Sequence, residues 1–125
     1  MIISIIISII GASSIASGAI LKHVLMGQLS PSELQVYSTA VTYHQLMSVV
    51  LLISLIAKRV PQCQRLISTT TIAFFLIGVV LFSGSLYAYI PFKITALMFI
   101  TPIGGLCMML GWVSIAINAI RHQSR

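Results

Sequence analysis

The chain has 125 residues, of which 58% are hydrophobic and 6% are charged. Soluble domains carry roughly 25% charged residues, so this composition excludes a soluble globular domain and indicates that lipid is the solvent. The formal net charge is +6, with Glu33 as the single acid; because the charges lie between apolar runs, we expect them to set membrane topology rather than to bind nucleic acid.

The first apolar run, residues 2–21, contains no charged residue. A bilayer core needs about 20 apolar residues in a helix, so the run predicts a transmembrane helix. No basic segment precedes it, and we therefore interpret it as a retained helix rather than a cleaved signal peptide. Gly11, Ser14 and Gly18 share one helix face and predict contact with another helix.

A polar connection leads to the second run, residues 40–57. In this connection Ser30, Pro31 and Glu33 have the order of an N-cap, a first helical residue and the partner of a capping box. We therefore expect the second helix to begin near Ser30, before the membrane. Lys58 ends the run.

The third run covers residues 70–90 and the fourth covers residues 94–120, with a tight reversal at Lys93 between them. Pro102 lies inside the fourth run. Because proline removes one helical hydrogen bond and clashes with the preceding turn, it predicts a kink in the fourth helix.

Basic residues are divided unevenly between the two sides of the predicted membrane domain. Four spans put the N-terminus, the second connection and the C-terminal tail on one side. That side holds five Lys and Arg against two on the other, which predicts that both termini are cytoplasmic. The larger group is Lys58, Arg59, Arg65, Arg121 and Arg125, and the smaller is Lys22 and Lys93.

These observations predict one membrane domain over residues 1–125, an all-α integral membrane four-helix bundle. Its most informative stretch mixes small residues, hydroxyls and a proline into the third and fourth helices. One interpretation is helix packing, because membrane helices associate through close backbone contact and hydrogen bonds. The other is a small polar cleft at a kinked helix. The residues concerned, called here the 82–112 set, are Phe82, Ser83, Gly84, Ser85, Tyr87, Thr101, Pro102, Gly104, Gly105, Gly111 and Trp112.

A second polar group falls near the predicted outer ends of the first two helices, and we call it the outer polar cluster. Its members are His23, Tyr43, His44 and Gln45. The functional alternatives are a proton, metal or haem site shared by the two histidines. Since a metal needs further ligands, we interpret the cluster as interfacial polar residues and assign no metal and no cofactor.

Three motifs in the second half carry a resemblance to a known family. They are FSGSLY at residues 82–87, TPIGG at 101–105 and GW at 111–112. In them the chain resembles the small bacterial inner-membrane proteins of the transmembrane protein 256 type, also called YgdD-like, a domain of unknown function. The first half is similar but looser, with His44 where the family has glutamine and Met47 where it has a second histidine. The resemblance implies the fold and an inner-membrane location, but no chemistry.

Two functional classes are excluded by missing residues. Four-helix drug/proton exporters couple transport through a carboxylate inside the membrane, whereas Glu33 lies in a connection. No phosphate-binding loop or nucleophile–base pair is present, so we do not expect an enzyme. We expect a non-enzymatic accessory, scaffold or assembly component, in contact with the lipid bilayer and with another membrane protein or a second copy. The alternative is binding or transport of a small solute or lipid through a cleft between the third and fourth helices.

Overall fold

The computed structural model describes residues 1–123, and the side chains up to Arg121. Within these residues there are four long α-helices and no strand. All four are long and apolar enough to cross a membrane, which confirms the predicted all-α membrane fold. The elements are α1 (Ile2–Ile20), the π-helical segment η1 (Leu21–Leu25) that continues it, α2 (Pro31–Arg59), α3 (Thr69–Phe92) and α4 (Ala96–Gln123).

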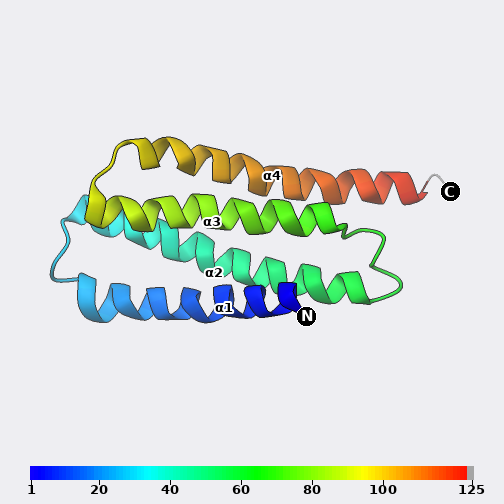
Figure 1. Ribbon diagram of the computed structural model, residues 1–125, viewed down its shortest axis with the longest axis horizontal. Coiled ribbons are helices and arrows are strands. Elements are labelled where there is room, and N and C mark those ends of the chain that lie inside the picture. Colours follow the sequence, from blue (N-terminus) through cyan, green and yellow to red (C-terminus); the bar gives the residue numbers. More distant parts are fainter. Residues whose placement is uncertain (124–125) are drawn as a thin grey trace.

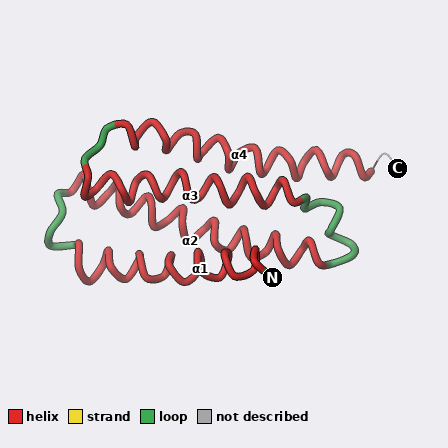
Figure 2. Tube along the Cα trace, viewed as in Figure 1, coloured by secondary structure: helices red, strands yellow, loops and turns green. Residues whose placement is uncertain are grey.

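The helices lie side by side in chain order, and each runs antiparallel to its neighbour (Figures 1 and 2). In the described part of the chain, close backbone approach joins only consecutive helices, most extensively α3 and α4. The bundle is therefore an open row, with α1 and α4 at its edges. The N-terminus, the α2–α3 connection and the end of α4 lie at one end of the bundle along the helix axes. The other two connections lie at the opposite end (Figure 1).

The two central helices supply most of the core. In the most apolar window of each helix, 39% of the residues are buried in α2 and in α3, against 11% in α1 and 17% in α4. Leu51 and Phe75 are fully buried at the centre, and Met47 and Met108 pack with them. The edge helices consequently present most of their apolar surface outward.

The predicted start of the second helix is confirmed. Ser30 is the N-cap of α2: its hydroxyl accepts a bond from the Glu33 N–H, and the Glu33 carboxylate accepts one from the Ser30 N–H at 2.9 Å. The helix thus begins well before the apolar run at residue 40, because a capping box rather than hydrophobicity decides where it starts. Ser68 caps α3 in the same way, through the Thr71 N–H at 3.0 Å.

Two predictions, the kink at Pro102 and the cytoplasmic side of the bundle, are not decided by the structure. α4 is helical on both sides of Pro102, and the kink expected there stays a prediction. Arg59 ends α2, Arg65 lies in the α2–α3 connection and Arg121 lies in the last turn of α4. These parts of the chain lie at the same end of the bundle as the N-terminus (Figure 1), while Arg125 lies outside the described residues. The assignment of this end to the cytoplasm likewise stays a prediction.

Candidate functional site

The closest approach of two backbones occurs between α3 and α4, at three buried glycines. A Cβ atom added to Gly104 would lie 2.8 Å from the carbonyl oxygen of Gly78, and still closer to the backbone nitrogen of Phe82. One added to Gly111 would lie 2.5 Å from the ring of Phe75. No side chain fits in these places, so glycine sets the spacing of the two helices.

Hydroxyl pairs cross the same interface. Ser85 Oγ and Thr101 Oγ1 share a hydrogen bond of 2.7 Å, and Thr71 Oγ1 and Ser114 Oγ share one of 2.6 Å. Ser83 faces the other way: its buried hydroxyl donates to the carbonyl oxygen of Ala40 on α2 at 2.9 Å. The hydroxyls of the 82–112 set are therefore engaged between helices.

Other members of the 82–112 set line a groove between α2 and α4, to which α3 contributes Phe82. Its volume is about 550 Å³ and its walls are mainly apolar. The ring of Tyr43 packs against that of Phe82 with centroids 4.6 Å apart. Pro102, Gly105 and Trp112 contribute from α4. The groove thus lies beside the hydroxyl pairs and is lined by other residues.

A chain of polar contacts crosses from α1 through α2 to α3. His44 Nε2 lies 3.4 Å from Ser13 Oγ, and His44 Nδ1 lies 3.2 Å from Tyr87 Oη. Ser48 fixes the next turn of α2 by donating to the His44 carbonyl oxygen at 2.6 Å. Beside this chain is a cavity of about 230 Å³, bordered by Gly84. We call it the His44 cavity.

The outer polar cluster does not converge on one point. Tyr43 points toward Phe82, whereas Gln45 donates to the Ser14 carbonyl oxygen on α1 at 3.4 Å. His23 is exposed in η1. It lies ten residues beyond Ser13, the α1 partner of His44, which is about 15 Å along a helix axis. Among the described residues there is no group of three His, Cys, Asp or Glu that could hold a metal ion.

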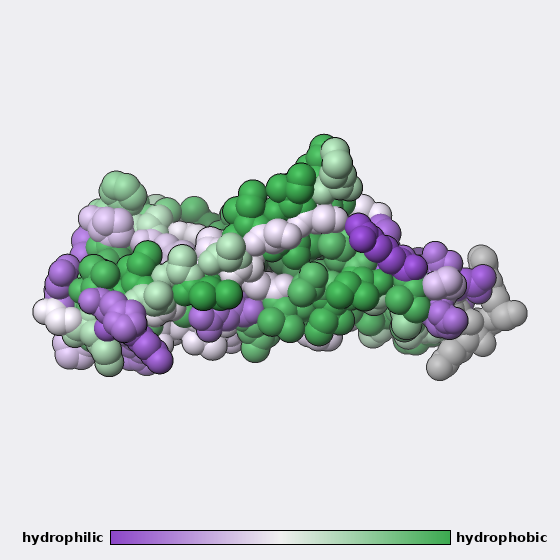
Figure 3. Space-filling model, turned by 90° about the horizontal axis from the view of Figure 1, so that it is seen from below, coloured by the Kyte–Doolittle hydropathy of each residue, from purple (hydrophilic) through white to green (hydrophobic). Residues whose placement is uncertain are grey.

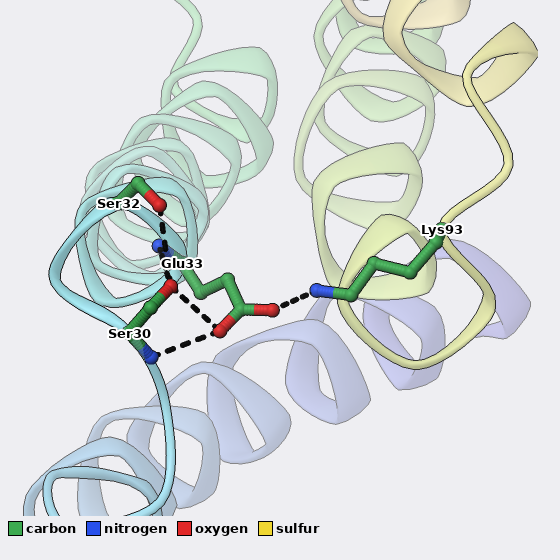
Figure 4. A network of polar contacts seen from close by, with 4 residues as sticks. All are labelled: Ser30, Ser32, Glu33 and Lys93. Carbon is green, nitrogen blue, oxygen red and sulfur yellow. Dashed lines mark hydrogen bonds and ion pairs between the residues drawn. The ribbon is translucent and has the colours of Figure 1, made fainter.

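One contact was not foreseen from the sequence. Lys93, in the turn after α3, forms an ion pair with Glu33 in the first turn of α2 (Figure 4). Lys93 adopts a left-handed conformation with φ of 53° as the C-cap of α3, which directs the chain into the turn. The signal available was that the only acid, Glu33, and two lysines, Lys22 and Lys93, fall at the same end of the predicted bundle.

Side-chain hydrogen bonds also join the helices at the end of the bundle that holds the N-terminus. Arg59 Nη2 donates to Ser4 Oγ on α1 at 3.1 Å, and Asn118 on α4 donates to the Leu66 carbonyl oxygen at 3.1 Å. Lys58 donates to Thr69 at the start of α3. Both edge helices are thus attached at this end by polar contacts.

Comparison with known proteins adds a family. Residues 17–105 match the family described as "Protein of unknown function (DUF423)". The chain is 33% identical over 110 residues to the UPF0382 membrane protein YwdK of Bacillus subtilis, covering 87% of this chain and 88% of that one. It is 33% identical over 119 residues to a UPF0382 membrane protein of Haemophilus influenzae, covering 94% and 93%. It is 32% identical over 121 residues to the UPF0382 inner membrane protein YgdD of Escherichia coli K12, covering 94% and 88%. No solved structure matches the chain significantly.

Proposed function

The chain belongs to the DUF423 family, whose function is unknown, and we propose that it serves in the membrane as a non-enzymatic scaffold or accessory component. The membership confirms the resemblance to YgdD-like proteins. Together with four helices of membrane-spanning length, it makes this a multi-pass protein of the bacterial inner membrane. The protein is therefore surrounded by the lipid bilayer. The scaffold role within it is our proposal.

The observation that carries the proposal is the use of the polar groups in α3. Ser83 and Ser85 are buried, and their hydroxyls bond to Ala40 on α2 and Thr101 on α4. Hydrogen bonds and close glycine contacts are what hold helices together in lipid. Groups engaged in this way favour a rigid α2–α3–α4 unit over a polar substrate path.

The sole acid supports the same interpretation. Glu33 accepts bonds from the Ser30 backbone and hydroxyl and pairs with Lys93 (Figure 4). A carboxylate held by a helix cap and an ion pair stabilises the connections at that end of the bundle. Its position at the first turn of α2 favours a structural role over proton transfer within the membrane.

The edge helices are the surfaces that a partner would meet. Phe99 on α4 is 74% exposed and Ile15 on α1 is 71% exposed. We propose that one of these faces contacts another membrane protein or a second copy of the chain. Lipid covers whichever face is unoccupied.

A second candidate function follows from the groove between α2 and α4. Its volume of about 550 Å³ and its apolar walls of Tyr43, Phe82 and Trp112 suit an acyl chain better than a polar solute. A lipid-binding role would place the chain among proteins that recognise or present lipid. It would use residues adjacent to those that hold the helices together.

Photo-crosslinking in living cells tests the scaffold role. A photoreactive amino acid is placed at Phe99 or at Ile15, and for comparison at Ile77, a half-exposed residue of the central helix α3. The scaffold role predicts a discrete protein adduct from an edge helix and a much weaker one from Ile77. An adduct of twice the chain's mass identifies a second copy.

Lipid adducts alone, equal at all three positions, would contradict the scaffold role. Selective lipid capture from Leu106, which lines the α2–α4 groove, would instead support the second candidate function.

A further inference from the structure

In the His44 cavity, side chains able to form hydrogen bonds gather around open space between three helices, with no charged residue among them in the described part of the chain. Ser13 comes from α1, His44 from α2, and Ser83, Gly84 and Tyr87 from α3. We propose that this cavity binds the head of an uncharged, lipid-soluble ring compound with a carbonyl oxygen, the chemical class of the membrane quinones. Ser83 is the residue that this cavity shares with the contacts supporting the scaffold role, and the proposal uses His44, Tyr87 and Gly84, on which the scaffold role does not depend.

Hydrogen-bonding capacity is the first argument. His44 reaches Ser13 at 3.4 Å and Tyr87 at 3.2 Å. Nitrogen–oxygen hydrogen bonds are usually 2.7–3.2 Å long, so these two lie at or beyond the long limit. An imidazole N–H or the phenol O–H can turn from such a weak bond to a ligand oxygen at little cost.

The absence of charge in the walls is the second argument. The remaining walls of the cavity are Ile10, Val79 and Val80, and no charged residue lines it among the described residues. An uncompensated charge is costly within a bilayer, so an ionised ligand would find no partner. A neutral ligand with one or two carbonyl oxygens satisfies the polar groups and the apolar walls together.

The volume and the aromatic walls of the His44 cavity further restrict the class of ligand. A volume of about 230 Å³ is below the roughly 300–1,000 Å³ of sites that enclose a drug-sized molecule. The cavity therefore admits one ring, with any tail lying outside among lipid chains. The rings of His44 and Tyr87, with centroids 5.8 Å apart, offer aromatic surfaces against which a planar ring packs favourably.

Gly84 provides a direct test, because it opens onto the cavity. A Cβ atom added there would meet no atom within 4 Å, and the same is true of Gly11, which borders a different groove between α1 and α2. The Cβ of Gly84→Leu therefore has room at the mouth of the His44 cavity, and we expect the rest of the leucine side chain to occupy the cavity. Gly11→Leu is the matched control, the same substitution at an equally open glycine.

Binding is measured with the full chain in lipid nanodiscs and with decylubiquinone as the probe, counting the quinone retained above that in empty nanodiscs. We expect saturable binding of one quinone per chain, weakened at least about tenfold by Gly84→Leu and unchanged by Gly11→Leu. Tyr87→Phe, which keeps the ring and removes one hydroxyl, is expected to weaken binding by about three- to tenfold. Circular dichroism checks folding, and Ser13→Leu replaces Gly84→Leu if that variant loses helicity.

Two results would overturn the proposal: retention no greater than in empty nanodiscs, or saturable binding that both cavity-filling variants leave intact. Methyl decanoate, an ester with a similar chain and no ring, is the competitor. We expect it not to displace the quinone. Equal competition would show that the cavity takes a lipid ester, and the assignment to a ring compound would be wrong.

Discussion

At the residue scale, neighbouring small residues of α3 make different contacts because they face different helices. Ser83, Gly84 and Ser85 are consecutive, and successive helical residues are about 100° apart around the axis. Ser83 consequently bonds to α2, Ser85 bonds to α4, and Gly84 faces the open cavity. A central helix in an open row uses all its faces in this way.

Glycine substitutions should separate packing from open space. Gly104→Leu forces a side chain against the backbone of Gly78 and Phe82, and overpacking of this kind typically costs about 1–3 kcal/mol. We expect a lower melting temperature in detergent for Gly104→Leu. Gly84→Leu, with no atom within 4 Å of the added Cβ, should melt within a degree or two of the unsubstituted chain, since surface changes usually stay within about 0.5 kcal/mol.

The comparison fails if both variants melt like the original protein, because glycine would then not set the spacing of α3 and α4. Equal destabilisation by both would mean that Gly84 is also in a tight contact.

The sequence predicted that small and hydroxyl residues of the third and fourth helices matter. It did not predict which of them faces which neighbouring helix. The composition of the 82–112 set indicated either helix packing or a polar cleft. Which glycine lies between α3 and α4 depends on the rotation of each helix about its axis. An all-apolar helix carries little polar and apolar pattern from which that rotation could be predicted. No motif or spacing in the chain indicated that His44 would contact Ser13 and Tyr87.

At the scale of elements, helix starts were more predictable than helix neighbours. The capping box at Ser30 fixes the start of α2 through local chemistry alone. The arrangement of the helices in a row depends on tertiary contacts, which no local signal encodes. The Glu33–Lys93 pair also depends on tertiary structure, because it joins the first turn of α2 to the turn after α3, which is distant in the sequence.

The α3–α4 turn offers a test of what holds these elements in place. Lys93 combines a left-handed backbone, φ of 53°, with a half-exposed ion pair. Exposed ion pairs contribute roughly 0–1 kcal/mol, and a left-handed non-glycine residue costs on the order of 1 kcal/mol. These effects oppose each other, so we expect Lys93→Gly to leave the melting temperature nearly unchanged.

Lys93→Ile is the matched variant. It loses the ion pair and places a β-branched residue in the left-handed region, so a loss of about 1–2 kcal/mol is expected. If Lys93→Gly melts as low as Lys93→Ile, the ion pair with Glu33 outweighs the backbone conformation, and our ranking of the two effects is wrong.

At the scale of the whole molecule, the surface has the layout that a bilayer requires. On the face seen in Figure 3, hydrophilic side chains gather toward the two ends of the long axis, and most of the surface between them is hydrophobic, interrupted by a smaller polar patch. Helices of 19 to 29 residues are about 28–44 Å long, enough to cross a hydrocarbon core of about 30 Å. The direction of crossing is predicted from the distribution of the basic residues.

Cysteine labelling tests that direction. Cys63 and Cys107 are first replaced by serine, and single cysteines are then introduced as Arg65→Cys and Lys93→Cys, both at exposed positions. Because α3 separates the two positions and the larger basic group is at the Arg65 end, the positive-inside rule predicts that a membrane-impermeant maleimide labels intact cells only at position 93. Position 65 should react after the membrane is opened. Labelling of only position 65 in intact cells would reverse the orientation and keep the fold, whereas labelling of both would mean that α3 does not cross the membrane.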